Sequence, residues 1–279
     1  DCVWTGAALL ERFMRDVFVK MGAPEADAAV IADVLITADK RGIDSHGIGR
    51  FKPIYIDRID QGILSPVTRI EVVREGPTTA VLDGHNGMGH VVAKRAMLLA
   101  IDKARAYGTG MVAVRNSSHY GIAGYYAGMC ADAGMIGITG TNARPSIAPT
   151  FGVENMLGTN PLTIAFPTDE PFPFNIDCAT SISQRGKIEA YERAGKPLPP
   201  GWVVGRDGQT LTDPKTVLDA LTRGACALTP LGGIGEETAG YKGYGYATAV
   251  EVLSAALSNA KFTRDLAGTD AAGNKIPYS

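Results

Sequence analysis

A histidine with polar neighbours follows one of the apolar runs of this 279-residue sequence. Residues 111–114 have the profile of a buried strand. The polar residues that follow are Asn116, Ser117, Ser118 and His119. The pKa range of histidine suits proton transfer near neutral pH. A histidine at a strand end is also commonly a hydrogen-bonded structural residue, so these residues alone leave both roles open.

A second apolar run, residues 135–139, ends in Gly140, Thr141 and Asn142. The segment between the two runs has the pattern of a helix, but it contains three glycines: Gly121, Gly124 and Gly128. Glycine lowers helix propensity, so close packing or close backbone approach is the expected reason for them. Two strand ends and a helix start are therefore expected to converge near His119.

The glycines that precede the next candidate helix do not form a Rossmann phosphate loop. Gly84, Gly87 and Gly89 come before a helix expected from about residue 91 to residue 107. Their order is G-x-x-G-x-G rather than G-x-G-x-x-G, and no acidic residue ends a paired second strand at the expected spacing. We interpret them as a turn followed by a helix start.

Neither histidines nor cysteines predict a metal site. No two of the four histidines have i,i+4 spacing, and no acidic cluster accompanies them. The cysteines are scattered without a C-x-x-C pair, which argues against a zinc site and a disulfide framework and fits a reducing cytoplasm. These residues are His46, His85, His90, His119, Cys2, Cys130, Cys178 and Cys226.

The composition is that of an ordinary globular protein, with 45% hydrophobic and 20% charged residues. The formal net charge of -2 gives no electrostatic reason to expect binding to nucleic acid or to an anionic membrane. We find no apolar run of about 18 residues and no secretory leader. A cytoplasmic location is therefore expected.

The first 65 residues have the pattern of three helices. Thr5 is expected to cap the first and Gly22 to end it. Pro24 suits the first turn of the second. The third carries one apolar face and ends at Gly62; the face consists of Phe51, Ile54, Tyr55 and Ile59. The polar segment 41–47 lies at the junction before this third helix.

The remaining chain alternates strands and helices. Residues 70–73 and 79–82 are expected to form a hairpin around Gly76 and Pro77. Further strands are expected at 162–166 and 174–177, helices at 182–194 and 246–257, a short surface hairpin at 202–204, and a glycine-rich loop at 228–240. Paired strands interspersed with helices predict an α/β protein of the α+β type, with a mixed, largely antiparallel sheet.

Six short motifs occur in one order along nearly the whole chain. They are K-R-G-I-D-S-H-G-I-G-R (40–50), N-S-S-H-Y-G (116–121), T-N-A-R-P (141–145), G-T-N-P (158–161), F-N-I-D-C-A-T-S (174–181) and G-Y-K-G-Y-G (240–245). Together they resemble the malate/L-lactate dehydrogenase family of the second, non-Rossmann type. That family also includes ureidoglycolate and sulfolactate dehydrogenases.

The resemblance implies a helical substrate-binding and dimerisation subdomain at residues 1–69 and a non-Rossmann nicotinamide-binding catalytic domain at residues 70–279. Family members normally form homodimers. They also continue with another strand and C-terminal helices, so part of the catalytic domain is expected to be missing here. The implied reaction moves a hydride between a small 2-hydroxyacid and NAD or NADP. Malate is the first guess and lactate the next. Relatives act on ureidoglycolate, sulfolactate, diketo sugar acids or cyclic imino acids.

Four residues match the substrate side of such a site. The resemblance implies that His119 accepts the hydroxyl proton. Arg50 is expected to hold the carboxylate, because guanidinium binds it at two points; otherwise it forms an ion pair on the surface, with Asp57 or Asp60 as its partner. Ser45 and His46 are expected to bind substrate oxygens, although a helix cap from Asp44 or Ser45 is the alternative.

The cofactor side is implied by three matched segments. These are Asn142 and Ala143; Asp177, Cys178 and Ala179; and Lys242 and Gly243. Lys242, between glycines, can reach a pyrophosphate, or it is a solvated loop lysine. Thr159 and Asn160 either line the same cleft or form the turn before Pro161.

The chain departs from the usual pattern at Ala143-Arg144 and has a lengthened loop at 225–239, so substrate and cofactor preference stay open. A protein that keeps the fold and binds ligands without turnover is the alternative from another class.

Overall fold

Two helices begin the computed structural model, which describes residues 4–269 and residue 276. Helix α1 spans Ala7–Lys20 and α2 spans Glu25–Lys40. Gly22, with φ of +98°, allows the turn between them. The predicted Thr5 cap is wrong, because Gly6 occupies the N-cap position and no side chain caps this end. The apolar faces of the two helices form most of the first core, together with Tyr55.

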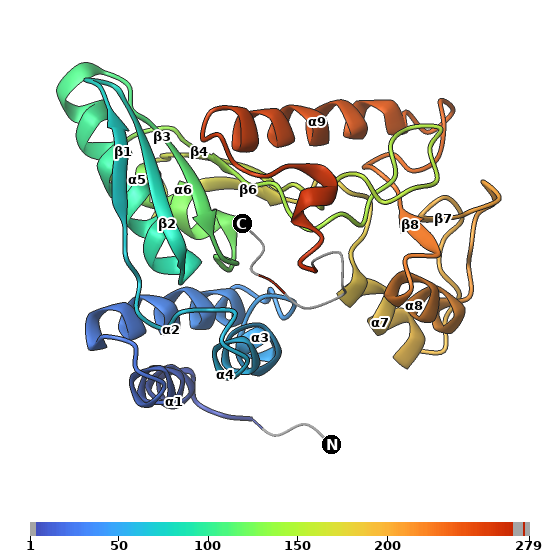
Figure 1. The fold of residues 1–279 in the computed structure, drawn as a ribbon, viewed down its shortest axis with the longest axis horizontal. Helices are drawn as coiled ribbons and strands as arrows, with labels where there is room; N and C mark the ends of the chain where they lie inside the picture. Colours follow the sequence, from blue (N-terminus) through green and yellow to red (C-terminus); the bar gives the residue numbers. More distant parts are fainter. Residues whose placement is uncertain (1–3, 270–275, 277–279) are drawn as a thin grey trace.

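The third helical segment is present but irregular. It consists of α3 (Ile48–Arg50), the π-helical turn η1 (Phe51–Ile56) and α4 (Asp57–Asp60). Pro53 lies inside η1 and contributes no backbone N–H. The wider turn buries Tyr55 completely. π-Helical turns are rare and often occur at functional sites. This segment, which lies below the sheets in Figure 1, is therefore a candidate part of a functional site.

The first sheet has the order β1-β2-β3. β1 (Glu71–Glu75) and β2 (Thr79–Gly87) form the predicted antiparallel hairpin, and β3 (Met111–Ser117) pairs parallel with β2. Helix α5 (Gly89–Tyr107) is the crossover between β2 and β3 and packs beside the sheet. The expected helix start is present at Gly89, but the expected turn is wrong, because Gly84 and Gly87 lie within β2. Within the described residues, the sheet contains no second parallel strand pair.

The second sheet has the order β4-β5-β6, entirely antiparallel. Its strands are β4 (Gly137–Gly140), β5 (Leu162–Phe166) and β6 (Phe174–Cys178), and helix α6 (Ala123–Asp132) connects β3 to β4. Helix α6 is the predicted glycine-containing helix. At its buried face, Tyr126 packs with Val34 of α2 and thereby joins the first helices to the sheets.

The last part of the chain differs most from the sequence expectations. It contains α7 (Arg185–Arg193), β7 (Val203–Gly205), α8 (Pro214–Thr222), β8 (Cys226–Leu228), α9 (Gly240–Ala256) and η2 (Thr263–Leu266). Helix α8 and strand β8 were not predicted. The segment expected to be a surface hairpin is buried, because β7 pairs with β8 inside a separate core. Helix α9 begins six residues earlier than expected, and its N-terminus follows the predicted loop.

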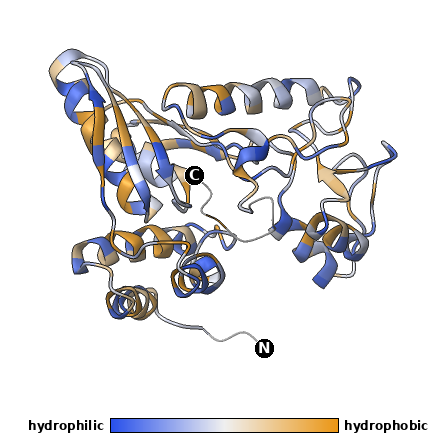
Figure 2. Cartoon of the chain, viewed as in Figure 1, coloured by the Kyte–Doolittle hydropathy of each residue, from blue (hydrophilic) through white to orange (hydrophobic). Residues whose placement is uncertain are grey.

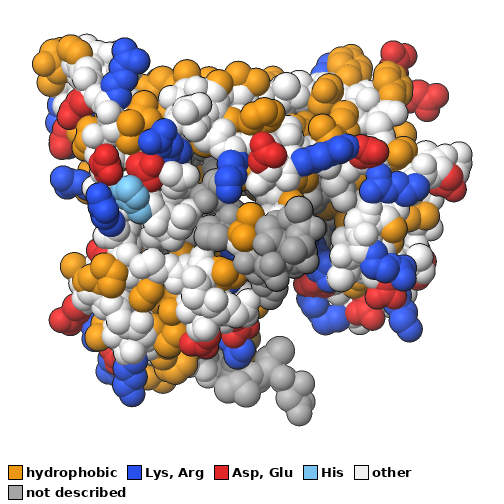
Figure 3. Space-filling view, in the orientation of Figure 1, with side chains coloured by type: hydrophobic (Ala, Val, Ile, Leu, Met, Phe, Trp, Pro, Cys, Tyr) orange, Lys and Arg blue, Asp and Glu red, His pale blue; other side chains and the backbone are white. Residues whose placement is uncertain are grey.

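The predicted fold class is confirmed: the chain is a mixed α/β protein with small, mostly antiparallel sheets. Among the described strands, only β2 and β3 run parallel, which excludes a Rossmann sheet from residues 70–180. Helix α7 is the most hydrophilic of the longer helices, with only Ile188 buried (Figure 2). Figure 3 shows basic and acidic side chains interspersed over one face, without a broad patch of either sign.

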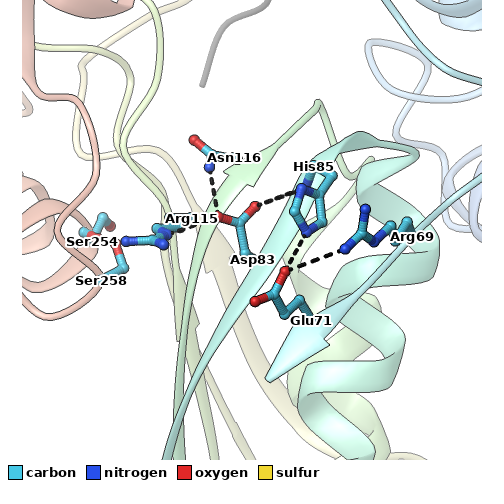
Figure 4. A network of polar contacts seen from close by, with 8 residues as sticks. All are labelled: Arg69, Glu71, Asp83, His85, Arg115, Asn116, Ser254 and Ser258. Atoms are coloured by element: carbon cyan, nitrogen blue, oxygen red, sulfur yellow. Dashed lines mark hydrogen bonds and ion pairs between the residues drawn. The ribbon is translucent and has the colours of Figure 1, made fainter. Parts of the chain in front are cut away.

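A polar network fixes the end of the first sheet (Figure 4). The buried Asp83 of β2 accepts hydrogen bonds from Arg115 Nε at 2.9 Å and Asn116 Nδ2 at 2.8 Å, and from the His85 backbone N–H at 2.9 Å. Burial acts to raise the pKa of Asp83, but these hydrogen bonds outweigh it and lower the pKa. His85 also contacts Glu71 at 3.0 Å. The network holds Asn116 in a left-handed conformation just before His119.

Candidate active site

Two histidines from distant parts of the chain stack on each other. His46 lies in the segment between α2 and α3, and His119 follows β3. Their ring centroids are 5.6 Å apart and their planes differ by 17°. The structure therefore brings together two residues that the sequence analysis assigned to one site. Both side chains are half-buried.

The Nδ1 atom of His119 has two partners on the protein. The hydroxyl of Tyr55 lies 2.6 Å away, and the backbone N–H of Gly121 donates at 3.3 Å. Tyr55 also contacts the ring of His90, with centroids 4.9 Å apart. Nδ1 is thus the ring nitrogen held by Tyr55 and Gly121, and Nε2 is the candidate nitrogen for contact with a substrate.

Burial and nearby positive charges keep the site histidines neutral. Burial, followed by His46, His90, Arg58 and Arg50, holds the pKa of His119 well below its usual range. Burial and then Arg50 also lower the pKa of His46, while the charge of Asp177 opposes this shift. A neutral histidine can accept a proton, so His119 meets the first requirement of a general base.

Ser45 and Arg50 lie next to the histidine pair. Ser45 Oγ is 2.8 Å from His46 Nδ1, and Arg50 Nε donates to the Ser45 carbonyl at 2.6 Å. Asp39 accepts from the Ile48 N–H at 2.9 Å and so caps the short helix α3. The alternative role of Asp44 or Ser45 as a helix cap is therefore filled by a different residue, Asp39. The Ser45 hydroxyl remains directed at His46.

Arg50 is not paired with the carboxylates that the sequence suggested. Asp57 pairs instead with Lys52. A Cβ atom on Gly186, at the start of α7, would lie 3.2 Å from an Arg50 guanidinium nitrogen, so α7 approaches this side chain closely. Gln184 lies just before α7, and its Nε2 donates a hydrogen bond to Ser45 Oγ at 3.5 Å. Arg50 thus lies beside Ser45 and the start of α7, and not in a surface ion pair with Asp57.

Asp177 of β6 connects the second sheet to the site. One carboxylate oxygen accepts from the Gly124 N–H at the start of α6 at 2.8 Å, and the other accepts from Thr163 Oγ1 at 3.0 Å. Its charge is close enough to act on the pKa of His46. Cys178, which follows in β6, is an exposed free thiol, and Ala179 lies next to it at the strand end.

Three of the predicted cofactor residues form a separate, internally bonded cluster. Asn142 Nδ2 donates to Glu251 Oε1 at 3.1 Å, and Ala143 N donates to Asn160 Oδ1 at 3.1 Å. The buried Asn160 also donates to Glu251 Oε2 at 2.8 Å. The Thr159 carbonyl accepts from the Thr180 N–H at 3.0 Å. Protein groups therefore already occupy the polar atoms of the Asn160 side chain.

Lys242 and Gly243 lie in the first turns of α9, not in a loop. Lys242 is exposed, with Nζ 5.9 Å from the ring centroid of Tyr241. A Cβ atom on Gly243 would lie 2.2 Å from the Leu231 carbonyl oxygen. Close packing against the preceding loop therefore accounts for this glycine. The described contact of Lys242 is with a neighbouring residue of α9 and not with the two stacked histidines.

Comparisons with known proteins identify the family of this chain. Residues 6–278 match the malate/L-lactate dehydrogenase family. Malate dehydrogenase of Pyrococcus horikoshii is 47% identical over 264 residues, covering 95% of this chain and 71% of the relative. L-sulfolactate dehydrogenase of Methanocaldococcus jannaschii is 46% identical, covering 88% of this chain and 67% of the relative. The chain belongs to the malate/L-lactate dehydrogenase family.

A solved structure of this family has the same fold. The crystal structure of malate dehydrogenase from Entamoeba histolytica is 48% identical and has a TM-score of 0.91, covering 94% of this chain and 73% of that one. The resemblance drawn from the short motifs is thereby confirmed. Dehydrogenases of this family imply a nicotinamide cofactor.

The side of the site near α7 suits a polar ligand such as this family's cofactor. Ser183 is buried, and its hydroxyl has no hydrogen-bond partner among the described residues. It directly precedes Gln184, whose amide reaches Ser45. An unpartnered buried hydroxyl costs free energy unless a ligand or water satisfies it. The residues present therefore fit a cofactor carrying amide and hydroxyl groups.

A larger cavity lies between the two sheets. Its volume is about 780 Å³, and its walls come from β3 and β4, α5 and α6, and α9. Asn142 is the only predicted site residue in its lining, although Ser118 and Tyr120, the neighbours of His119, also contribute. The cavity thus borders the chain around the base without containing the histidine pair.

The sequence analysis did not single out two residues that contact the candidate site, Tyr55 beside His119 and Gln184 beside Ser45. Tyr55 was assigned only to an apolar helix face, and Gln184 only to a helical segment. The one hydroxyl on that apolar helix face, five residues after Arg50, was the available signal for Tyr55. Gln184 offered none, because its approach to Ser45 depends on how α7 packs.

The part of the chain that the structure describes contains no group of three or more histidine, cysteine, aspartate or glutamate residues placed to hold a metal ion. Within the same residues, no helix combines the length and apolar character that a membrane crossing requires.

Proposed function

We propose that this protein transfers a hydride between a small 2-hydroxyacid and a nicotinamide cofactor, with malate as the first substrate to test. The observation that carries the proposal is the neutral His119 stacked on His46, with Ser45 and Arg50 beside them. This arrangement provides a base, hydroxyl and imidazole donors, and a carboxylate-binding cation within one site. A malate dehydrogenase and an L-sulfolactate dehydrogenase among the relatives support an acidic 2-hydroxyacid.

In the oxidation direction, His119 Nε2 accepts the proton of the substrate hydroxyl as the hydride leaves C2. Arg50 holds the carboxylate, because a guanidinium fixes it at two points and thereby orients C2. Ser45 and His46 hold the substrate oxygens. When bound, the nicotinamide takes up or supplies the hydride. In the reverse direction, the protonated His119 returns its proton to the oxygen of the 2-oxoacid.

The cofactor is proposed to contact Asp177, Cys178 and Ala179, with Lys242 as the candidate for its phosphates. Asp177 is supported by its electrostatic effect on His46. Asn142, Ala143, Thr159, Asn160 and Gly243 are proposed to shape the surrounding backbone. NAD and NADP remain alternatives, and both belong in the assay.

We further propose a cytoplasmic homodimer. The described cysteines, Cys130, Cys178 and Cys226, are all free thiols, which suits a reducing compartment. The dimer is suggested by the family alone. Light scattering coupled to size exclusion tests it, and a monomer at micromolar concentration contradicts it.

A substrate panel tests the proposed function. Malate, sulfolactate, lactate and ureidoglycolate, and the matching oxoacids, are each incubated with NAD(H) or NADP(H), and the nicotinamide absorbance is followed. Diketo sugar acids and cyclic imino acids complete the panel. Turnover of one 2-hydroxyacid supports the proposal. Cofactor binding without turnover of any substrate supports the alternative of a non-catalytic binding protein.

The base is tested in the same assay with His119→Ala. Because a positioned acid–base group contributes about 10²- to 10⁴-fold, turnover is expected to fall within that range while cofactor affinity changes little. Near-normal turnover of this variant would remove His119 from the mechanism.

A further inference from the structure

A general base needs a partner for its second nitrogen. When Nε2 of a histidine accepts a proton from substrate, Nδ1 carries a hydrogen, and that hydrogen needs an acceptor. In many enzymes the acceptor is a carboxylate. The Nδ1 atom of His119 forms hydrogen bonds with Tyr55 and Gly121. The backbone N–H of Gly121 can only donate, so of these two partners only the Tyr55 oxygen can accept a hydrogen from Nδ1.

We propose that Tyr55 is the positioning residue for proton transfer by His119, with its hydroxyl accepting the Nδ1 hydrogen in the state that reacts. This inference rests on the proposed function, because it presumes that His119 exchanges the proton. The step is balanced within the site: the substrate O–H bond breaks, the Nε2–H bond forms, and the hydride leaves with the electron pair of the C2–H bond. Tyr55 keeps its own proton throughout.

The geometry supports this role. The Tyr55 oxygen lies 2.6 Å from Nδ1, shorter than the 3.3 Å contact with Gly121. Tyr55 is completely buried, packs against Phe18 and His90, and is fixed within the π-helical turn η1. Nδ1 carries a hydrogen both in the neutral tautomer whose Nε2 accepts the proton and in the imidazolium that forms, and a hydroxyl oxygen can accept that hydrogen in both states. The same residue can therefore hold the imidazole ring before and after proton transfer.

A neutral partner also fits the charges around the base. His46, His90, Arg58 and Arg50 face His119 from the segment before α3, from α5, from α4 and from α3. Burial raises the pKa of Tyr55, so the phenol keeps its proton at neutral pH. A carboxylate in its place would favour the imidazolium. The phenol orients the ring and leaves His119 unprotonated, as a base requires.

The proposal is tested first with Tyr55→Phe, which keeps the buried ring. A hydrogen bond to a charged group is stronger than one to a neutral group, so its loss destabilises the imidazolium more than the neutral histidine. The oxidation rate is expected to fall about 10- to 100-fold. The pKa of His119 should fall further. Since oxidation requires the unprotonated base, the acidic limb of the pH profile should move to lower pH.

Tyr125→Phe is the matched control. Its phenol donates to Asp33 at 2.5 Å and lies away from the histidine pair, so its loss removes one hydroxyl without touching His119. This variant should keep the wild-type pH limb. If Tyr55→Phe matches Tyr125→Phe in both rate and pH limb while wild-type protein turns over, the inference is overturned and the proposed function stands. Absence of wild-type turnover overturns the proposed function instead.

Two further measurements do not depend on Tyr55→Phe being active. The ¹⁵N shift of His119 Nδ1, recorded without substrate or cofactor, should change in Tyr55→Phe if the hydrogen bond exists in solution; an unchanged shift contradicts the proposal. Should that variant fail to fold, fluorinated tyrosines at position 55 preserve the shape and weaken the oxygen as an acceptor. Oxidation should slow with each added fluorine, and equal rates across the series would overturn the role of Tyr55.

Discussion

At the scale of single residues, Arg50 is where the structure changes the interpretation most. Its predicted alternative was a surface ion pair with Asp57 or Asp60, but Asp57 pairs with Lys52. Arg50 Nε is instead anchored on the Ser45 carbonyl at 2.6 Å. This contact orients the guanidinium plane, which leaves the other nitrogens for a substrate carboxylate.

Arg50→Lys should therefore damage catalysis although the charge is kept. An ammonium cannot hold the Ser45 carbonyl and form a two-point contact with a carboxylate at once. A charge-assisted hydrogen bond contributes about 1.5–3 kcal/mol, so kcat/KM for the acid should fall roughly 10- to 150-fold. NAD(P)H affinity, measured by fluorescence titration, should scarcely change. Wild-type kcat/KM in this variant would exclude Arg50 from carboxylate binding.

The buried His90 should make the stability of the folded protein depend on pH. It is fully buried in the first turn of α5, and neither ring nitrogen has a hydrogen-bond partner among the described residues. Burial lowers its pKa to about 3. Between that value and the ordinary pKa near 6.5, the unfolded chain binds a proton that the folded chain does not. Stability should therefore fall as the pH drops through this window.

The expected magnitude is about 1.4 kcal/mol per pH unit for one such group, or roughly 2 kcal/mol at pH 5 relative to pH 7. His90→Leu removes this contribution at similar volume, and urea unfolding at the two pH values measures it. The difference between pH 7 and pH 5 should shrink by about that amount. An unchanged difference would mean that His90 is protonated or partnered in the folded protein.

At the scale of elements, helical periodicity was the most reliable guide. The apolar spacing of α1 and α2 and the run before His119 predicted these elements where they occur. The failures have identifiable causes. Lys242 and Gly243 were assigned to a loop because glycines obscure the start of α9, yet Gly243 is required by the close approach of Leu231. Helix α8 was missed, although Asp213 caps it and Pro214 occupies its first turn.

The sequence predicted those candidate site residues that lie in the short motifs. Ser45, His46 and His119 were assigned to one site, and the structure confirms that they lie together. Tyr55 and Gln184 were not, because their contacts with His119 and Ser45 depend on the π-helical turn and on the packing of α7. Local sequence patterns do not encode such tertiary contacts. The division at residue 69 stays a prediction.

Gly124 and Gly128, both in α6, allow the effect of close packing on stability to be distinguished from the effect of helix propensity. A Cβ atom on Gly124 would lie 2.5 Å from Asp177 Oδ2, whereas one on Gly128 would meet nothing within 4 Å. Gly124→Ala should displace Asp177 from its bonds to the helix start and to Thr163. We expect a loss of about 1–3 kcal/mol and reduced turnover, because Asp177 acts on His46.

Gly128→Ala is the control in the same helix. Alanine is about 1 kcal/mol more favourable than glycine inside a helix, so this variant should be at least as stable as wild type, with unchanged turnover. Chemical unfolding and steady-state kinetics of both variants decide the matter. Equal stability of the two variants would show that Asp177 relaxes without cost.

At the scale of the whole molecule, the site exists only because two parts of the chain are packed together. His46, Arg50 and Tyr55 come from the first helical region, while His119 and Asp177 come from the sheets. Val34 of α2 is fully buried and packs with Ile122 and Tyr126 at this junction. Catalysis should therefore be sensitive to packing at a position that touches no substrate.

Val34→Ala tests this dependence against Val204→Ala. Both valines are buried, but Val204 belongs to a small cluster around β7, away from the histidines. Each substitution removes two buried methyl groups and should cost about 2 kcal/mol. Because Val34 packs α2 against the start of α6, which follows His119, its loss should also lower kcat at temperatures where the variant stays folded. Val204→Ala should keep wild-type kcat. Equal kcat in both variants would show that the α2–α6 junction contributes stability alone.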